Sequence, residues 1–270
     1  MKVIVGGGTV GTELAKRLGH LIVEEAPQLG GIHAYDEMAG TRVPLQPVLS
    51  EEVCTSSYLE LEIRKAYEKD EYLEEKVCRG PCPKWFRAER AKYLLFPEFD
   101  KVNWIKGRAK TVKGKKLILQ GFSQLDFDEL YLASPPEELG LIRPREFLSV
   151  ATIIAVLKSW DKDWDLKVSG DDLKLYNRLI HLELDGMHVL YVESYFSKVP
   201  PSWDRVKADL KRFERIDLEK AVSVRYRIIK YAVLLGGGET GLPEGIKVCG
   251  RFKQWSNPTF CESTRLALEC

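Results

Sequence analysis

The stretch Lys2–Gly11, KVIVGGGTVG, constrains the fold more strongly than any other part of the sequence. It opens as a short buried β-strand. Gly6, Gly8 and Gly11 then follow at the spacing G-x-G-x-x-G, and Thr9–Leu18 has the apolar spacing of a helix. In this arrangement Gly6 permits a tight strand-to-helix turn, Gly8 lets the backbone approach a pyrophosphate, and Gly11 lets the helix pack closely on the strand. The context predicts a dinucleotide-binding site rather than an ordinary glycine turn.

Two further features of this region suit a dinucleotide. Thr9 and Val10 lie in the first turn of the predicted helix, where free N–H groups and the positive end of the helix dipole attract phosphates. Leu21–Glu24 predicts a second parallel strand. A carboxylate at its end, Glu24 or Glu25, is suited to accept hydrogen bonds from the hydroxyls of an adenosine ribose. A solvated acidic loop is the alternative, and the spacing to the next glycines favours Glu24 for the ribose.

Composition narrows the classes of function. The chain has 270 residues, 44% of them hydrophobic and 30% charged, so it can form one large domain or two smaller ones. A net charge of +1 gives no broad attraction for nucleic acid or an anionic membrane, and no apolar run has the length of a membrane span. Because the strand and glycine turn start at residue 2, we expect no signal peptide and a cytoplasmic protein. Scarce Gln and Asn beside abundant Lys and Glu favour a thermophilic source.

The cysteine pattern predicts no metal site. Of the six cysteines only Cys78 and Cys82 are close in sequence, within the run CRGPC. The further paired ligands that zinc or an iron–sulfur cluster needs are absent from the sequence. A redox pair or a surface disulfide is one interpretation of Cys78 and Cys82, but we favour two unrelated loop thiols.

A second glycine pair narrows the kind of dinucleotide. Gly30-Gly31 follows Glu24 after a short loop, where a nicotinamide dehydrogenase usually continues its βαβ pattern. Here the sequence resembles the flavoprotein group of amine oxidases, protoporphyrinogen oxidases, phytoene desaturases and UDP-galactopyranose mutases, and LIVEEAPQLGGIHAYDE is most similar to the mutase version. The resemblance implies that Gly30 and Gly31 pass the FAD and that Arg42, in the returning loop GTRVPL, faces flavin or substrate. An exposed loop arginine is the alternative for Arg42, and His33 is interpreted as a loop histidine.

Two later segments extend the resemblance. In Phe127–Pro136 a strand ends in Ala-Ser-Pro-Pro, similar to the Ala-Thr-Pro ending of a main-sheet strand in the group, which implies a cofactor contact at Ser134. Ala109 falls where the group's backbone meets the adenine. Gly245–Phe252 predicts a strand that ends in Gly-Arg, and a helix over Thr259–Leu268 follows, whose positive end in the group stabilises negative charge on the reduced flavin. The FAD contacts that the resemblance implies in this segment are Gly250, Arg251, Pro258, Thr259 and Phe260.

Outside these motifs the sequence supports a coarse prediction. A capping box of Ser57 and Glu60, with apolar residues at helical spacing after it, predicts a helix. The remaining elements follow from apolar alternation and turn residues. We expect strands at Val102–Ile105, Gly107–Val112, Lys116–Leu119, Leu179–Leu184, His188–Ser194 and Val222–Val233, and a helix at Trp203–Phe213.

Two groups of basic residues have two interpretations each. The run PCPKWFRAERAKYLLFP either lines a substrate pocket in which its cations meet an anion, or packs by its aromatic rings, and packing is favoured. The residues concerned are Lys84, Arg87 and Arg90, beside Trp85 and Phe86. In the strand Val222–Val233, Arg225 and Arg227 are either strand-face charges or a pair aimed at an acidic substrate.

Together these features predict an α/β fold with a Rossmann-like FAD-binding domain of the two-dinucleotide-binding type and an interleaved, smaller α+β substrate domain. The cofactor domain is expected to take residues 1–50, 97–140 and 235–270, and the substrate or cap domain residues 51–96 and 141–234. The chain is shorter than the typical enzymes of the group. Its substrate domain is therefore expected to be trimmed, and substrate residues do not carry over.

The function that fits is an FAD-dependent oxidoreductase that takes a hydride from a C–N or C–C bond of a small molecule. The sequence has no Ser/His/Asp or Cys/His nucleophile pattern, and an FAD enzyme needs none because the isoalloxazine performs the hydride chemistry. The alternatives are a mutase-like enzyme, in which reduced flavin attacks a sugar nucleotide, and a non-catalytic FAD-binding subunit. Gly250-Arg251 disfavours a plain NAD-binding module. We expect no metal, no nucleic acid and no membrane span, and leave a homo-oligomer or a partner subunit open.

Overall fold

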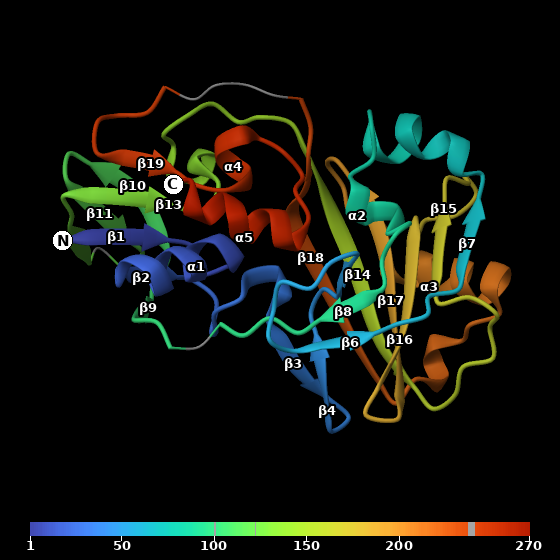
Figure 1. Ribbon diagram of the computed structural model, residues 1–270. Helices are drawn as coiled ribbons and strands as arrows, with labels where there is room; N and C mark the ends of the chain where they lie inside the picture. The colour runs from blue at the N-terminus through green and yellow to red at the C-terminus, as the bar shows by residue number, and fades with distance from the viewer. Residues whose placement is uncertain (100, 122, 237–240) are drawn as a thin grey trace.

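The computed structural model of the chain describes residues 1–99, 101–121, 123–236 and 241–270. Figure 1 shows two halves side by side, one built on a five-stranded sheet and the other on a six-stranded sheet. Both termini lie in the half with the five-stranded sheet. The chain crosses between the halves several times, so each sheet is assembled from segments that are far apart in sequence.

The five-stranded sheet is parallel throughout and has the strand order β19-β13-β1-β2-β9. Its strands are β1 (Lys2–Val5), β2 (Leu21–Glu24), β9 (Trp104–Lys106), β13 (Glu129–Leu132) and β19 (Ile246–Val248). Most of them are short apolar runs because both faces of the sheet are covered. One face packs on helix α1 (Thr9–Leu18) through Ile4 and Leu14, and the other packs on a small antiparallel sheet through Val3 and Leu117.

Local sequence explains where the two helices beside this sheet begin and end. Helix α1 occupies the predicted residues and ends at Gly19, whose left-handed φ of 68° terminates it. Helix α5 (Phe260–Leu268) begins at a capping box, in which the side chains of Thr259 and Glu262 each accept a hydrogen bond from the other's backbone N–H. The two helices pack together on one side of the sheet (Figure 1).

The six-stranded sheet has the order β18-β14-β17-β16-β15-β7 and is antiparallel except between β15 and β7. Its strands are β7 (Lys65–Glu68), β14 (Phe147–Leu157), β15 (Leu166–Ser169), β16 (Arg178–Leu184), β17 (Met187–Phe196) and β18 (Ser223–Leu234). Successive side chains point to opposite faces. Ile153 and its neighbours pack on helix α3 (Trp203–Asp209) and the π-helical turn Leu210–Glu214, whereas Ile154 and its neighbours face residues 38–96.

The remaining segments form three small sheets and several short helices. The small sheets pair β3 (Tyr35–Met38) with β4 (Thr41–Pro44), β8 (Tyr93–Leu95) with β5 (Val48–Ser50) and β6 (Tyr58–Glu60), and β11 (Lys116–Leu119) with β10 (Ala109–Lys113) and β12 (Gln124–Asp126). The short helical segments are α2 (Lys84–Arg87), α4 (Arg251–Gln254), 3-10 turns at Gly31–His33, Asp70–Tyr72, Pro136–Leu139 and Leu218–Lys220, and a π turn at Glu74–Cys78. None of the helices in the described ranges has the length and apolar character that a membrane crossing requires.

The structure confirms most predicted strands and corrects one helix. The helix predicted after Ser57 is wrong, because Tyr58–Glu60 forms strand β6 beside β8 and residues 65–68 form β7 beside β15. Both strands pair with distant segments, and this tertiary pairing overrides the local helical spacing. The sequence prediction also omitted β14, a long and almost wholly buried strand between β17 and β18.

The prediction of two unrelated thiols at Cys78 and Cys82 is wrong, because these residues form a disulfide. The other four cysteines are bridged as well. The further disulfides are Cys54–Cys261 and Cys249–Cys270. Disulfides persist in oxidising compartments and also inside hyperthermophilic cells. The cytoplasmic location and the thermophilic source both stay predictions.

Candidate functional site

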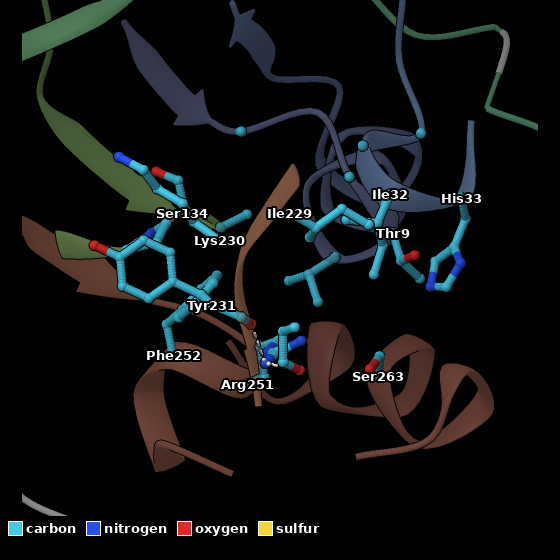
Figure 2. Close-up of a pocket in the computed structure, with 18 of the residues that line it drawn as sticks. Thr9, Ile32, His33, Ser134, Ile229, Lys230, Tyr231, Arg251, Phe252 and Ser263 are labelled. Carbon is cyan, nitrogen blue, oxygen red and sulfur yellow. Dashed lines mark hydrogen bonds between the residues drawn. The ribbon is translucent and has the colours of Figure 1, made fainter. Parts of the chain in front are cut away.

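A cavity of about 460 Å³ lies between the two main sheets. The turn after β1, the ends of β2 and β13 and the C-terminal segment border it from the five-stranded sheet. Strands β14, β16, β17 and β18 border it from the six-stranded sheet, together with Trp85 of α2. Figure 2 shows side chains from both halves around this space, among them Thr9, His33, Ile229 and Arg251.

Of the three glycines of the G-x-G-x-x-G motif, Gly6 and Gly11 pack against neighbouring atoms and Gly8 faces open space. A Cβ on Gly11 would lie 1.8 Å from the carbonyl oxygen of Gly6, so helix α1 approaches the turn as closely as only glycine allows. Gly6 itself has a φ of +99°, and a Cβ there would press on Ala133 at 3.1 Å. A Cβ on Gly8 would meet nothing within 4 Å, although Gly8 borders the cavity. The space at Gly8 is therefore available to a ligand.

The carboxylate of Glu24 is fixed at the end of β2. It accepts hydrogen bonds from the backbone N–H of Gly7 at 2.5 Å and from the backbone N–H of Ala26 at 2.8 Å. Glu24 is 9% exposed and borders the cavity. Glu25 also borders the cavity, but its exposed carboxylate pairs with Arg108 at 3.1 Å. Of the two glutamates, Glu24 is the one that the backbone holds in place.

The second glycine pair lies directly against the first glycine turn. The backbone N–H of Gly30 donates to the carbonyl oxygen of Gly7 at 2.8 Å. Gly31 has a φ of +57°, and a Cβ on it would lie 3.3 Å from the Cα of Gly8. Side chains at these positions would strain the backbone or fill the approach to Gly8. The two glycine motifs thus form one continuous wall of the cavity.

Opposite this wall, a bulge in strand β18 is held by Arg251. The pairing of β18 with β14 shifts register between Leu148 and Val150, and Tyr231 in the bulge has a left-handed φ of 53°. The guanidinium of Arg251 donates through Nη2 to the carbonyl oxygens of Tyr231, at 2.7 Å, and of Ala232, at 3.3 Å (Figure 2). Burial lowers the pKa of Arg251 to about 10, so the side chain stays charged at neutral pH.

His33 lies deep in the site and is neutral at physiological pH. Desolvation lowers its pKa to about 4; the carbonyl of Gln46 raises it in part, and the charges of Arg251 and Arg227 lower it further. Its ring packs edge-to-face on Phe260 at a centroid distance of 5.2 Å. The interpretation of His33 as an ordinary loop histidine is therefore incomplete, because its ring borders the cavity.

We expect His33 to make the protein less stable in acid. An unfolded histidine titrates near pH 6.5, whereas the pKa of His33 in the folded protein is about 4. The unfolded state then binds more protons below pH 6.5, so this contribution to stability is complete above pH 6.5 and falls away toward pH 4, by up to about 3 kcal/mol. Urea unfolding at pH 7 and at pH 4.5 measures the free energy of unfolding of the wild-type protein and of His33→Gln. Between the two pH values, the variant should lose less of this free energy than the wild-type protein. Equal losses would contradict the prediction.

The structure brings most of the predicted cofactor residues to the cavity. Those that border it are Gly6, Gly8, Thr9, Val10, Glu24, Glu25, Gly30, Gly31, Ala109, Ser134, Arg251, Pro258 and Phe260. Three others lie behind this wall: Gly11 against Gly6, Gly250 against Val10, and Thr259 as the N-cap of α5. A Cβ on Gly250 would come within 2.5 Å of the Val10 side chain. These three residues position the lining and do not form it.

Arg42 lies away from the cavity, contrary to its predicted place beside flavin or substrate. It is exposed on β4, and its guanidinium stacks on the ring of Tyr35 at 3.9 Å. The hairpin β3–β4 turns the side chain outward, which the loop motif alone did not indicate.

The basic residues with two interpretations also lie off the cavity wall. Lys84 pairs with Glu262 at 3.5 Å, Arg87 lies near Asp70, and Arg90 is exposed. On β18, Arg225 forms an ion pair with Asp36, and Arg227 donates to the carbonyl oxygen of Gly31 at 3.3 Å. From the aromatic run, Trp85 borders the cavity and Phe86 is fully buried in the core.

Sequence reasoning missed several residues on the side of the cavity formed by the six-stranded sheet. They are Gln46, Val150, Arg178, Tyr195, Ile229, Lys230 and Tyr231. One of them could have been found from the sequence: Arg178 is a cation at the start of the otherwise mostly apolar run RLIHLEL. In the structure this residue is 2% exposed, which is unusual for an arginine. Among the described residues no cluster of His, Cys, Asp and Glu is arranged to hold a metal ion.

No protein family model and no curated protein sequence matches the chain. Its structure does match solved structures. Reduced UDP-galactopyranose mutase aligns with a TM-score of 0.69 at 12% identity, over 99% of this chain and 92% of that chain. A CLA-producing fatty acid isomerase from P. acnes aligns with a TM-score of 0.68 at 9% identity, over 99% and 97% of the two chains. A putrescine oxidase with redesigned cofactor binding gives a TM-score of 0.62 at 10% identity, over 99% and 97%.

The chain has the fold of these enzymes. Identities this low establish a fold and no activity. The expected fold class, α/β of the Rossmann-like FAD-binding type, is confirmed, and so is the expected resemblance to this group of proteins at the level of fold. In this chain the parallel sheet carries the glycine turn, and the six-stranded sheet borders the cavity on the other side.

Proposed function

We propose that this chain binds FAD and acts as an FAD-dependent oxidoreductase on a small molecule. One observation carries the proposal: two glycine motifs and the anchored carboxylate of Glu24 meet along one wall of a cavity, the six-stranded sheet closes it on the other side, and Arg251 borders it. The similarity in fold to a putrescine oxidase and to UDP-galactopyranose mutase supports it. The hydride source is proposed to be a C–N or C–C bond.

The residues around the cavity fit such a cofactor. Gly8 leaves room for a pyrophosphate at the first turn of α1, where helix N–H groups lack acceptors within the helix. Glu24 presents a carboxylate to a ribose, as expected at the end of a second parallel strand. Arg251 has an Nε atom without a hydrogen-bond partner among the described residues, and it would meet an electron-rich part of the cofactor. When bound, FAD supplies hydride transfer, while the chain supplies position and charge.

A spectrum of the purified protein tests the proposal. A flavoprotein should be yellow and should release FAD on denaturation. Anaerobic addition of amines, alcohols, carboxylic acids or other dehydrogenation substrates should bleach the flavin bands if the protein is an oxidoreductase. A colourless protein that binds NAD tightly would contradict FAD binding.

Mutase-like chemistry is the second candidate, supported by the TM-score of 0.69 to reduced UDP-galactopyranose mutase. Turnover of a sugar nucleotide only after reduction of the flavin with dithionite would favour it. Inertness in both assays, together with a co-purifying protein, would favour a non-catalytic subunit. The same purification would therefore also reveal a partner subunit or a homo-oligomer.

Replacing Glu24 by alanine should weaken FAD binding by about 10- to 100-fold, because hydrogen bonds to a charged group contribute about 1.5–3 kcal/mol. The measurement is FAD titration of the deflavinated protein. Glu25→Ala is the matched control, since this neighbouring carboxylate is exposed and paired with Arg108. Equal effects of the two substitutions would contradict the ribose role of Glu24.

We also propose the division into a discontinuous cofactor domain, residues 1–50, 97–140 and 235–270, and a substrate domain, residues 51–96 and 141–234. Every strand of the five-stranded sheet falls in the first set and every strand of the six-stranded sheet in the second, which supports this division. Binding of a small-molecule substrate would then use the cavity wall that the second set supplies.

A further inference from the structure

One part of the cavity wall carries a polar group that the proposed FAD contacts leave unused. Gln46, Trp85, Arg178 and Tyr195 border the cavity there, and we call these four residues the polar end. Arg178 and Tyr195 come from β16 and β17, and Trp85 comes from α2, which packs against the same face of the six-stranded sheet. Three of these four residues therefore come from the half of the molecule that does not carry the glycine turn, and Gln46 comes from the loop between β4 and β5.

A fully buried carboxylate, Glu193, lies behind the polar end and is already satisfied. It accepts hydrogen bonds from the hydroxyl of Tyr195 at 2.8 Å, from Nη1 of Arg178 at 3.2 Å, and from Nε2 of Gln46. Arg178 and Glu193 are direct neighbours across β16 and β17, so the sheet register fixes the ion pair. Since Arg178 compensates the charge of Glu193, this carboxylate offers little attraction to a further cation.

Two buried atoms of the polar end have no hydrogen-bond partner within the described part of the chain: Nε of Arg178 and Oε1 of Gln46. A carboxylate only accepts, so Gln46 must turn its amide nitrogen to Glu193 and keep its oxygen as a free acceptor. Arg178 donates through Nη1 to Glu193 and through Nη2 to the carbonyl oxygen of Trp85 at 3.1 Å, which leaves the N–H at Nε as a free donor. Buried polar atoms are normally paired, so a ligand is expected to complete this donor and acceptor.

A protonated amine does not suit these surroundings. It would meet the guanidinium of Arg178 at the polar end, and the cavity wall also carries the cations of Arg251 and Lys230. The carboxylates that border the cavity belong to the other half of the molecule, at the end of β2 and in the turn after β13. They are Glu24, Glu25 and Glu138.

We propose that the polar end binds an oxygen-bearing group of the substrate, a carboxylate or a hydroxyl, and rejects protonated amines. The oxygen accepts from Nε of Arg178, and a hydroxyl also donates to Oε1 of Gln46. The rings of Trp85 and Tyr195 add aromatic surface beside these atoms, which suits a flat apolar group next to the oxygen. This assignment rests on the proposed function, because it places the substrate in the same cavity as the cofactor.

Three probes that share one ring test the assignment: benzoate, benzyl alcohol and benzylamine. Each is titrated into the purified flavoprotein, and the change in the visible flavin spectrum gives a dissociation constant. We expect benzoate and benzyl alcohol to bind at least about 10-fold more tightly than benzylamine, because a like charge beside Arg178 is repelled. Benzylamine binding as tightly as benzoate would overturn the proposal.

A double variant identifies the residue that binds the probe. Arg178→Gln alone would leave Glu193 buried without its counter-ion, so Arg178→Gln/Glu193→Gln, which removes both charges, is the variant to use. It should weaken benzoate binding by about 10-fold or more and leave the content of bound flavin unchanged. Arg225→Gln is the matched control, because this exposed arginine of the same sheet lies off the cavity wall. Unchanged benzoate binding in the double variant would overturn the proposal.

Flavin content separates this proposal from the one on which it rests. A protein that purifies without flavin and does not take up FAD contradicts the proposed function. The same probes are then titrated by tryptophan fluorescence, with Trp85→Phe as the background. Tighter binding of benzoate and benzyl alcohol than of benzylamine, seen as a fluorescence change that disappears in Trp85→Phe, supports the polar end even in a protein without flavin. Benzylamine binding as tightly as the other two probes contradicts it.

Discussion

Replacing Gly8 by leucine is expected to yield a folded protein that no longer retains flavin. A Cβ at this position meets nothing within 4 Å, so the larger side chain has room in the ligand-free protein. That room is where the first turn of α1 borders the cavity, and a leucine there would occupy the path proposed for the pyrophosphate. We expect FAD affinity to fall by about 100-fold or more, which corresponds to about 2.7 kcal/mol. Flavin absorbance per protein and the far-ultraviolet circular dichroism spectrum measure the two effects separately.

Gly11→Ala is the control for Gly8→Leu, because it alters the same motif by a smaller group. Its Cβ would lie 1.8 Å from the carbonyl oxygen of Gly6, so α1 must move away from the turn. We expect this variant to lose about 1–3 kcal/mol of stability or more, along with its flavin. A Gly8→Leu protein with full flavin content would contradict the cofactor assignment, and a Gly8→Leu protein as unstable as Gly11→Ala would contradict the open space at Gly8.

Removing the disulfide Cys54–Cys261 should destabilise the protein by about 5 kcal/mol in the chain-entropy description of disulfides. The bridge joins residues 207 apart in sequence, and so it restricts the unfolded chain far more than a short loop would. It also fastens the loop after β5 to the first turn of α5, where Phe260 and Ser263 border the cavity. Denaturant unfolding of the Cys54→Ser/Cys261→Ser protein measures the loss, and its flavin should dissociate faster.

Cys78→Ser/Cys82→Ser is the matched comparison for this disulfide. Its two cysteines are only 4 apart in sequence, so the same description predicts a loss of about 2 kcal/mol. Equal destabilisation by the two double substitutions would show that chain entropy is not the cause. Destabilisation by neither would show that the bridges do not form in the purified protein.

Features specified by neighbouring residues could be predicted from the sequence. The glycine spacing, the apolar stripe and Gly19 together predict α1 residue for residue. The capping residue Thr259 marks the start of α5 in the same way. These elements depend on local geometry, which a short window of sequence contains.

Features specified by distant partners could not be predicted in this way. Residues 58–68 have helical spacing, yet pairing with β8 makes Tyr58–Glu60 a strand and pairing with β15 makes Lys65–Glu68 another. Strand β14 has no flanking glycine and no alternation, because both of its faces are buried. The polar end draws on three separate elements and on an ion pair, Arg178–Glu193, that exists only once β16 lies beside β17. The cysteine pairs likewise depend on the folded chain, as Cys54 and Cys261 show.

The strand order β19-β13-β1-β2-β9 has a consequence for synthesis of the protein in the cell. A ribosome produces the glycine turn long before Arg251 and Ser263, which border the same cavity. A nascent chain that stops before β19 lacks the C-terminal wall and should not capture flavin. Cofactor loading is therefore expected only after this wall has been synthesised, and a cell short of flavin would accumulate chains that have an empty cavity.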